Sequence, residues 1–241
     1  MRRLSAGLGA GIAALAIATP ANAATVTRSG TTLTYQAASG EVNTPQIAGS
    51  TQTQTITVDD GSPGDGCAQD PSSAGVVCPQ AGITLVRLRL GDLDDRLASR
   101  TPDNAITLPR GVRLEVDGGP GKDSVIGTKG NDVLSGGSGA DKLFGSGGAD
   151  MLRGGPGNDR LTGFGTLDGG AGDDFLEAFY GFGDEYKPFP TRVFAGPGND
   201  AVLSGNKVPD RIDCGTGRDR ATTTDKRGFD SLGKNCETRF G

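Results

Sequence analysis

Five aspartates recur at intervals of nine residues in the middle of this chain: Asp123, Asp132, Asp141, Asp150 and Asp159. Each occupies the sixth position of a nine-residue repeat with glycine at positions one and four and an aliphatic residue at position eight. Carboxylates held at a regular spacing are suited to binding hard divalent cations, which prefer oxygen ligands. The first chemistry that the sequence indicates is therefore ion binding along a periodic structure.

The residues that are missing narrow the chemistry further. The chain contains no histidine, which removes the usual general base, the histidine-activated nucleophiles and the commonest zinc ligand. Once the export signal described below is removed with Arg2 and Arg3, 22 basic residues face 29 acidic ones, a net charge of −7. We expect neither nucleic acid nor an anionic membrane as a partner of such a surface.

The elements that must position the aspartates follow from the repeat itself. A six-residue glycine turn and a three-residue strand cannot bury one aliphatic side chain alone, so copies must stack into a solenoid. With two copies per coil, Asp123, Asp141 and Asp159 line one edge, and Asp132 and Asp150 line the other. The aliphatic residues sort in the same way between two facing sheets: Val125, Leu143 and Leu161 in one, Leu134 and Leu152 in the other.

Stacking brings the carboxylates of one edge close together. Neighbouring strands lie about 4.8 Å apart, where two negative charges repel by about 1 kcal/mol in water and about 3 kcal/mol at an effective dielectric of 20. Glycine permits the backbone conformations that turn carbonyl oxygens inward, so that both kinds of oxygen can surround an ion. An all-oxygen set favours calcium over zinc. The candidate ligands are the five aspartates and the position-four glycines Gly121, Gly130, Gly139, Gly148 and Gly157.

Turn capping is an alternative role for these aspartates. Aspartate often caps a turn by accepting hydrogen bonds from nearby backbone amides. Capping accounts for aspartate at one position. It does not account for the glycine and the aliphatic residue that recur with it at a fixed period, so we prefer calcium binding.

The repeat continues, with interruptions, toward the C-terminus. A segment of only six residues, 163–168, precedes a copy that adds Asp174 to the candidate ligands, and an insertion at 178–194 precedes one that adds Asp200. The later copies occupy Gly169–Glu177, Ala195–Leu203 and, more loosely, Cys214–Asp219.

These copies resemble the RTX, or hemolysin-type, calcium-binding nonapeptide repeat, whose pattern is Gly-Gly-x-Gly-x-Asp-x-apolar-x. The match is close over residues 118–177 and looser over 195–222. The resemblance implies that calcium lies between successive turns of one edge, held by position-six aspartates and turn carbonyls, and that the repeats are disordered without the ion. Thr128 and Ser146 depart from the glycine at position two.

Residues 1–23 have the pattern of an export signal. Arg2 and Arg3 precede an apolar stretch and the small-residue site Ala21-Asn22-Ala23, which predicts cleavage before Ala24 and a secreted, extracellular protein. An uncleaved anchor is the less favoured alternative, because the apolar run is shorter than the roughly 18 residues of a membrane span. Many RTX proteins carry an uncleaved C-terminal signal instead; this chain is more similar to small secreted members with cysteine-stapled ends.

Four cysteines in an exported chain predict two disulfides. Three pairings are possible, and the pairing of sequence neighbours joins Cys67 to Cys78 and Cys214 to Cys236. Loop-closure entropy assigns each bridge roughly 3 kcal/mol. Free or metal-binding thiols are the alternative, which no Cys-x-x-Cys pair supports.

The sequence thus predicts an all-β protein, a parallel β-roll or β-solenoid with strand-rich, disulfide-stapled caps at both ends. Segments rich in β-branched side chains indicate strands. Glycine and proline indicate that residues 59–81 form a loop stapled by the first cysteine pair. We expect a monomer with the following division: signal peptide 1–23, β-rich N-terminal cap or solenoid extension 24–117, calcium-binding roll 118–222 with the insertion 178–194, and C-terminal cap 223–241.

The alternative function is binding or hydrolysis of a polysaccharide. Residues 175–194 hold seven of the twelve aromatic residues, together with Glu177, Asp184 and Glu185. Aromatic faces bind sugars, and a pair of carboxylates can hydrolyse them. Such a cluster is more often a small core beneath a long loop. We therefore expect a protein that is not an enzyme, with an extracellular glycan or matrix partner left open.

Overall fold

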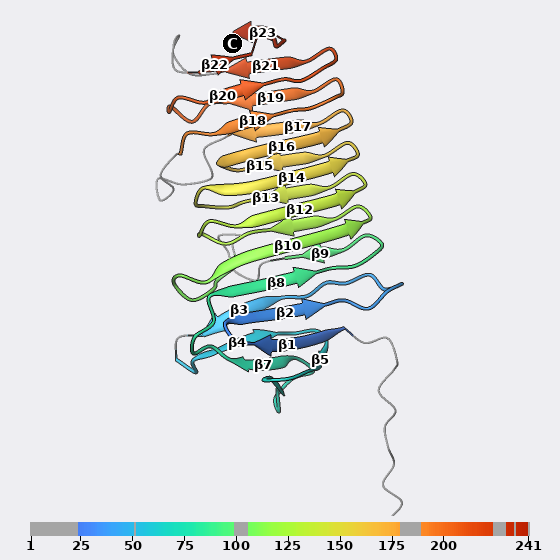
Figure 1. The fold of residues 1–241 in the computed structure, drawn as a ribbon, viewed down its shortest axis with the longest axis vertical. Coiled ribbons are helices and arrows are strands. Elements are labelled where there is room, and N and C mark those ends of the chain that lie inside the picture. Colours follow the sequence, from blue (N-terminus) through green and yellow to red (C-terminus); the bar gives the residue numbers. More distant parts are fainter. Residues whose placement is uncertain are drawn as a thin grey trace, which may run out of the picture.

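The computed structural model describes residues 24–50, 52–98, 106–178, 189–223, 230–233 and 235–240. The export signal predicted at 1–23 lies outside these residues. All the elements assigned in these ranges are β-strands. No helix in the described residues could span a membrane. Figure 1 shows the strands stacked as successive rungs of one elongated column.

Two long sheets form the column. The larger has eleven strands in the order β22 (Ser231–Leu232), β20 (Arg211–Asp213), β18 (Arg192–Phe194), β16 (Gly165–Ala171), β14 (Asp150–Pro156), β12 (Val133–Ser138), β10 (Arg113–Pro120), β8 (Leu85–Arg89), β2 (Thr32–Gln36), β1 (Thr25–Ser29) and β5 (Ser62–Pro63). The facing sheet has eight: β23 (Glu237–Phe240), β21 (Arg220–Thr223), β19 (Ala201–Ser204), β17 (Phe175–Ala178), β15 (Arg160–Thr162), β13 (Lys142–Phe144), β11 (Ser124–Ile126) and β9 (Arg96–Leu97).

From β8 onward the chain alternates between the two sheets, so each coil contributes one strand to each. All neighbours in this part are parallel. The predicted all-β parallel roll is therefore confirmed. Strands β11, β13 and β15 have the predicted three residues, whereas β10, β12 and β14 are longer because their ladders continue into the glycine turn.

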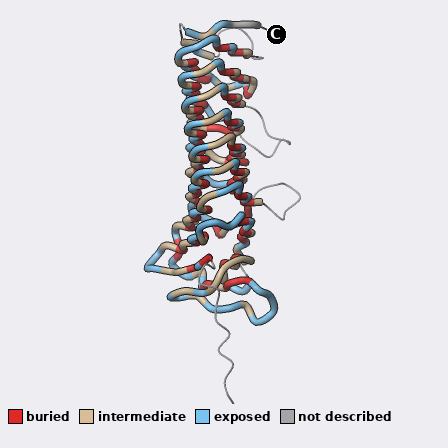
Figure 2. Tube along the Cα trace, turned by 90° about the vertical axis from the view of Figure 1, so that its right-hand side faces the viewer, coloured by how far each residue is buried: buried red, intermediate tan, exposed pale blue. Residues whose placement is uncertain are grey.

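The core is a single column of aliphatic side chains between the sheets. Val125 pairs with Leu143 and Leu143 with Leu161 in the smaller sheet, while Leu134 pairs with Leu152 in the larger one. The predicted sorting of alternate copies is thus confirmed. These five side chains are at most 2% exposed, and Figure 2 shows buried positions following the whole length of the narrow roll. Burying each contributes roughly 1.5–3 kcal/mol relative to leaving it in water.

Phe164 explains how the short segment at 163–168 fits into the roll. Consecutive aspartates of one edge are 18 residues apart at Asp141 and Asp159 but only 15 apart at Asp159 and Asp174. The missing residues come from the opposite edge, where Gly163 and Phe164 alone join β15 to β16. The Phe164 side chain is 1% exposed. A buried aromatic ring thus stands where other coils have a glycine turn.

The N-terminal cap combines roll strands with a separate sheet. Strands β2, β8 and β10 are in parallel register, so the roll extends well before the first clear repeat. A four-stranded antiparallel sheet lies beside it, in the order β3 (Ile47–Ser50), β4 (Thr55–Val58), β7 (Val76–Pro79) and β6 (Ala68–Gln69).

The prediction that 59–81 is only a loop is wrong, because Val76 and Val77 pair with β4. Both predicted disulfides are present, Cys67–Cys78 and Cys214–Cys236. Cys78 lies in β7, and Cys214 follows β20 directly. The second bridge therefore ties the last glycine turn to Cys236, the residue before β23.

The insertion predicted at 178–194 is shorter than expected. Ala178 completes β17, and Arg192–Phe194 forms β18 within the larger sheet. The reason is register: Val193 pairs with Leu167 and continues the buried row. Residues 179–188 lie outside the described part of the chain.

Phe164→Ala should lower the free energy of unfolding by about 3–5 kcal/mol, the usual cost of truncating a buried phenylalanine. Chemical denaturation in saturating calcium would measure this loss. Phe194→Ala is the matched control, since Phe194 is 45% exposed, and a surface change of this kind usually alters stability by about 0.5 kcal/mol or less. Equal losses in the two variants would contradict the role assigned to Phe164.

Candidate calcium sites

The edge that carries Asp123, here called the near edge, holds an unbroken column of hydrogen-bonded aspartates. The backbone N–H of Asp123 donates to Oδ1 of Asp141 at 2.7 Å, and that of Asp141 donates to Oδ1 of Asp159 at 2.8 Å. The same bond links every consecutive pair of the near-edge column, which consists of Asp95, Asp123, Asp141, Asp159, Asp174, Asp200 and Asp219. One oxygen of each carboxylate therefore holds the neighbouring coil.

The second oxygen of each carboxylate has no protein partner. The Oδ2 atoms of all seven near-edge aspartates are buried without a hydrogen bond, and the side chains are at most 3% exposed. Native proteins leave few buried polar atoms unpaired, because each unpaired atom costs about 1–3 kcal/mol. Seven in one row indicate a common ligand that the chain itself does not supply.

A carbonyl of the next coil borders the same space as Oδ2. A side chain on Gly118 would collide with both Asp123 Oδ2 and the carbonyl oxygen of Gly136, and one on Gly154 with both Asp159 Oδ2 and the carbonyl oxygen of Gly169. At these two turns, the absence of a side chain on Gly118 and Gly154 leaves the room in which the oxygens approach. Two facing oxygens repel each other unless a cation lies between them, which fits an oxygen-loving ion such as calcium.

The position-four glycines stack directly over one another. A side chain on Gly139 would collide with the carbonyl oxygen of Gly121, and one on Gly157 with that of Gly139. The φ angles of Gly121, Gly139 and Gly157 are 154°, 138° and 147°, a range that side chains disfavour. These turn carbonyls thus point along the column axis, as the oxygen ligands of a row of stacked ions must. Gly148 shares the positive φ, and Gly130 does not.

The opposite, far edge is different. Thr128 donates from its backbone N–H and its hydroxyl to Asp132 Oδ2, at 2.6 and 2.9 Å. Asp132 is therefore a turn cap, the alternative that the sequence left open, and its Oδ2 is already partnered. Asp150 keeps an unpartnered buried Oδ2, but its own N–H donates to the carbonyl of Phe164 instead of to another carboxylate. The far-edge row is interrupted there. It resumes in later coils, where the backbone N–H of Thr191 donates to Oδ1 of Asp210 at 2.7 Å and that of Asp210 donates to Oδ1 of Asp230 at 3.0 Å.

The donor set is distinct from that of a side-chain metal cluster. In the described ranges, no group of three or more acidic or cysteine side chains converges on one point. Each coil instead offers one carboxylate and several carbonyls. This mixture suits calcium, which takes six to eight oxygens, better than it suits zinc.

Burial makes the carboxylates reluctant to ionise without a cation. It raises the pKa of Asp123 and of Asp174 to about 7, with smaller contributions from the charges of neighbouring aspartates such as Asp141 and Asp159. The pKa of Asp159 rises to about 6 and that of Asp150 to about 9, again chiefly through burial. A bound divalent cation would favour the charged form.

Comparison with known families addresses the same region. A family model described as the RTX calcium-binding nonapeptide repeat (4 copies) matches residues 117–152 and 144–178. Residues 117–178 are RTX repeats. RTX repeats bind calcium ions, in agreement with the all-oxygen donor set. No curated protein and no solved structure matches the chain.

The near-edge column is longer than the RTX match. The candidates Asp174 and Asp200 lie in it beside Asp123, Asp141 and Asp159. Sequence reasoning missed its two ends, Asp95 and Asp219. The signal for Asp95 was present, since Leu97 follows it at the spacing of Val125 after Asp123, but Leu93 stands where the repeats have glycine. Leu93 adopts the required positive φ of 74° nonetheless.

The aromatic segment does not form a described site. Glu177 accepts hydrogen bonds from Arg160 and Thr162 at 3.1 and 3.2 Å, and the Arg160 guanidinium covers the ring of Phe175 at 4.6 Å. Both residues are therefore engaged within the sheet. The other two acidic candidates, Asp184 and Glu185, lie outside the described residues.

In a calcium chelator, the chain should be more stable at about pH 5 than at about pH 8. The folded-state pKa of Asp123 and of Asp174 is about 7, above the unfolded value of about 3.9. The stability of the ion-free fold is therefore greatest below about pH 4, falls as pH rises from about 4 to about 7, and levels off above that. Thermal unfolding followed by circular dichroism would measure the difference.

Saturating calcium is the control for this pH dependence. Protons then compete with the ion for the same oxygens, so acid should destabilise the loaded protein. The same pH trend with and without calcium would show that the buried aspartates are not the ligands.

Proposed function

We propose that this chain is a secreted calcium-binding protein in which the near-edge column and the adjoining turn carbonyls hold a row of calcium ions. Binding drives folding of the roll. The proposal assigns the ligands to Asp123, Asp141, Asp159, Asp174 and Asp200 with the carbonyls of the glycine turns. It assigns Asp150 to an isolated far-edge site and leaves Asp132 as a turn cap.

The single observation that carries the proposal is the row of buried Oδ2 atoms without partners. Turn capping needs only one carboxylate oxygen, and Oδ1 already performs that task along the column. The remaining oxygens border turn carbonyls, as Asp123 Oδ2 borders that of Gly136. A divalent cation satisfies that arrangement while the carboxylates stay ionised.

Coupling to folding follows from the same charges. The oxygens converge only when the coils are stacked, so the unfolded chain has no comparable site. An ion that binds the folded state alone stabilises it in proportion to the logarithm of its free concentration. Without the ion, buried carboxylates must either ionise against one another or take up protons, and at neutral pH both alternatives weaken the roll.

Two features expected of a secreted chain support this proposal. The two disulfides suit an oxidising compartment, and the sequence at 1–23 predicts export. Calcium-dependent folding would keep the repeats loose where calcium is scarce and order them outside the cell. Among the residues that the structure describes we propose no catalytic role and no glycan site, because Glu177 and Phe175 are both in contact with Arg160.

The test is a calcium titration of the mature chain, followed by far-ultraviolet circular dichroism and with magnesium as the ion control. We expect a cooperative gain of β signal with calcium alone. A spectrum that does not respond to calcium would reject the coupling, and an equal response to magnesium would reject the selectivity.

Asp141→Ala should raise the calcium concentration at the midpoint at least about tenfold, since even outer-shell changes cost 10–100-fold in metal affinity. Asp132→Ala should shift it much less, because Thr128 already satisfies that carboxylate. Asp117→Ala, at an exposed strand position, controls for the loss of one negative charge. Equal shifts in all three variants would contradict the assignment of ligands.

A further inference from the structure

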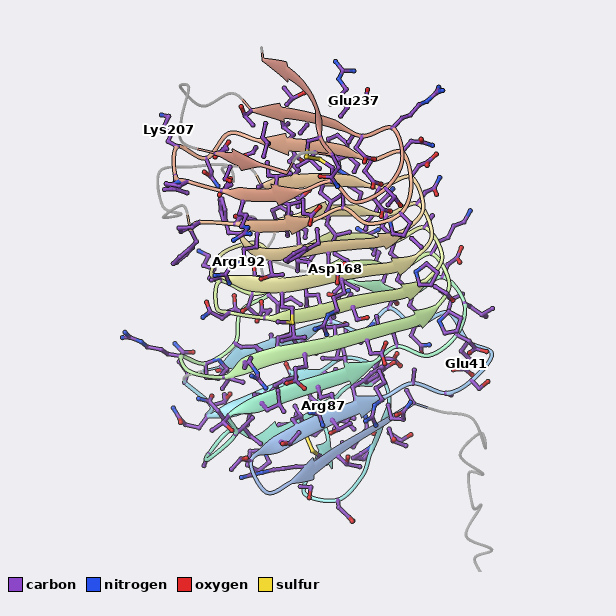
Figure 3. All side chains as sticks on the ribbon, turned by 45° about the horizontal axis from the view of Figure 1, so that its top comes forward. Glu41, Arg87, Asp168, Arg192, Lys207 and Glu237 are labelled. Atoms are coloured by element: carbon purple, nitrogen blue, oxygen red, sulfur yellow. A yellow bond between two sulfur atoms is a disulfide. The ribbon has the colours of Figure 1, made fainter. Side chains whose placement is uncertain are left out.

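Asn43 occupies the place of a position-six aspartate in the coil before Asp95. Its backbone N–H donates to Oδ1 of Asp95 at 2.6 Å, the bond that links every pair of the near-edge column. Its carbonyl accepts the N–H of Arg96 at 2.8 Å, as the carbonyl of Asp123 accepts that of Lys142 at 2.7 Å. Pro45, two residues later, is buried like the aliphatic residues at position eight. In Figure 3, Glu41 marks this turn, on the edge opposite Lys207.

The Asn43 side chain makes the contacts that the carboxylates lack. Nδ2 donates to the carbonyl oxygens of Leu90 and Glu41 at 2.9 and 2.8 Å and lies 3.3 Å from Oδ1 of Asp95. Only the nitrogen end of the amide can donate to carbonyls, which fixes its orientation. The side chain is 3% exposed. It thus meets two carbonyls and a carboxylate, the same kinds of oxygen that surround the unpartnered Oδ2 atoms.

The Leu90 carbonyl is the counterpart of the carbonyl that faces each Oδ2. Gly119 stacks on the carbonyl of Gly91, so Gly91 holds position two and Leu90 holds position one of its coil. In the repeats, the position-one carbonyl of Gly136 faces the carboxylate of Asp123 across Gly118. At the N-terminal end, the equivalent carbonyl faces an N–H group. A carbonyl oxygen that faces an ionised carboxylate oxygen needs a cation between the two, whereas a carbonyl oxygen that faces an N–H group accepts a hydrogen bond from it.

We propose that the Asn43 amide replaces a calcium ion and ends the near-edge column, so that Asp95 is its first ion-binding carboxylate. This inference rests on the proposed calcium function. It adds a site outside the RTX match, because the Asp95 Oδ2 is buried, unpartnered and attached to a side chain that is 2% exposed. The column thereby begins on a hydrogen bond internal to the protein, and the cap below it is independent of calcium.

The experiment counts calcium ions by native mass spectrometry of the folded mature chain and measures its melting temperature in chelator. In Asn43→Asp, a carboxylate oxygen faces the Leu90 carbonyl oxygen in place of the amide N–H group. This variant should therefore bind one calcium ion more than the wild type and melt at a lower temperature in chelator. Asn131→Asp adds the same charge at an exposed turn position that keeps its acceptor oxygen. This control should leave both quantities unchanged.

Asp123→Asn is the reverse change and keeps the inference testable if Asn43→Asp does not fold. It points an N–H group at the Gly136 carbonyl, so the chain should lose one calcium ion and melt at a higher temperature in chelator. A wild type that takes up no calcium would reject the proposed function itself. A wild type that binds calcium while Asn43→Asp keeps the same count and the same chelator stability would overturn only the inference about Asn43.

Discussion

Repulsion between buried oxygens is the constraint on which this structure depends. Parallel strands about 4.8 Å apart place every position-six carboxylate beside the next one and against a turn carbonyl. Oδ1 is satisfied by the amide of the neighbouring coil, and Oδ2 is not. A divalent cation converts this repulsion into attraction. The stack that buries the aliphatic column is thus the same stack that creates the ion sites.

Glycine serves two separate purposes in the turns of this roll. At position four it permits the positive φ that aims carbonyls along the axis, as in Gly139 and Gly157. At position one it leaves the room in which a carboxylate and a carbonyl meet, as at Gly118. The two edges diverge where this chemistry changes. Phe164 interrupts the far edge with an apolar side chain, whereas the near edge passes the shortened coil without losing its hydrogen-bond column.

The ends of the roll show how a periodic structure can stop. At the N-terminal end, the side chain of Asn43 supplies hydrogen-bond donors, and an antiparallel sheet with its own disulfide lies beside the first strands. At the C-terminal end, Cys214 follows β20 and is bridged to Cys236. The Asn43 hydrogen bonds and the two disulfides are contacts that involve no ion. The caps can therefore hold the register while the middle responds to the ion.

The sequence by itself determined the all-β roll and the parity of the copies, and it placed Asp123, Asp141 and Asp159 on one edge. It could do so because a nine-residue period fixes which residues share an edge and which face the core. Only the tertiary structure decided that Asp132 is capped by Thr128, that Phe164 interrupts the far-edge row and that Asp95 and Asp219 extend the near edge. These outcomes depend on which atom of a distant coil lies opposite each oxygen, and a local repeat does not encode that.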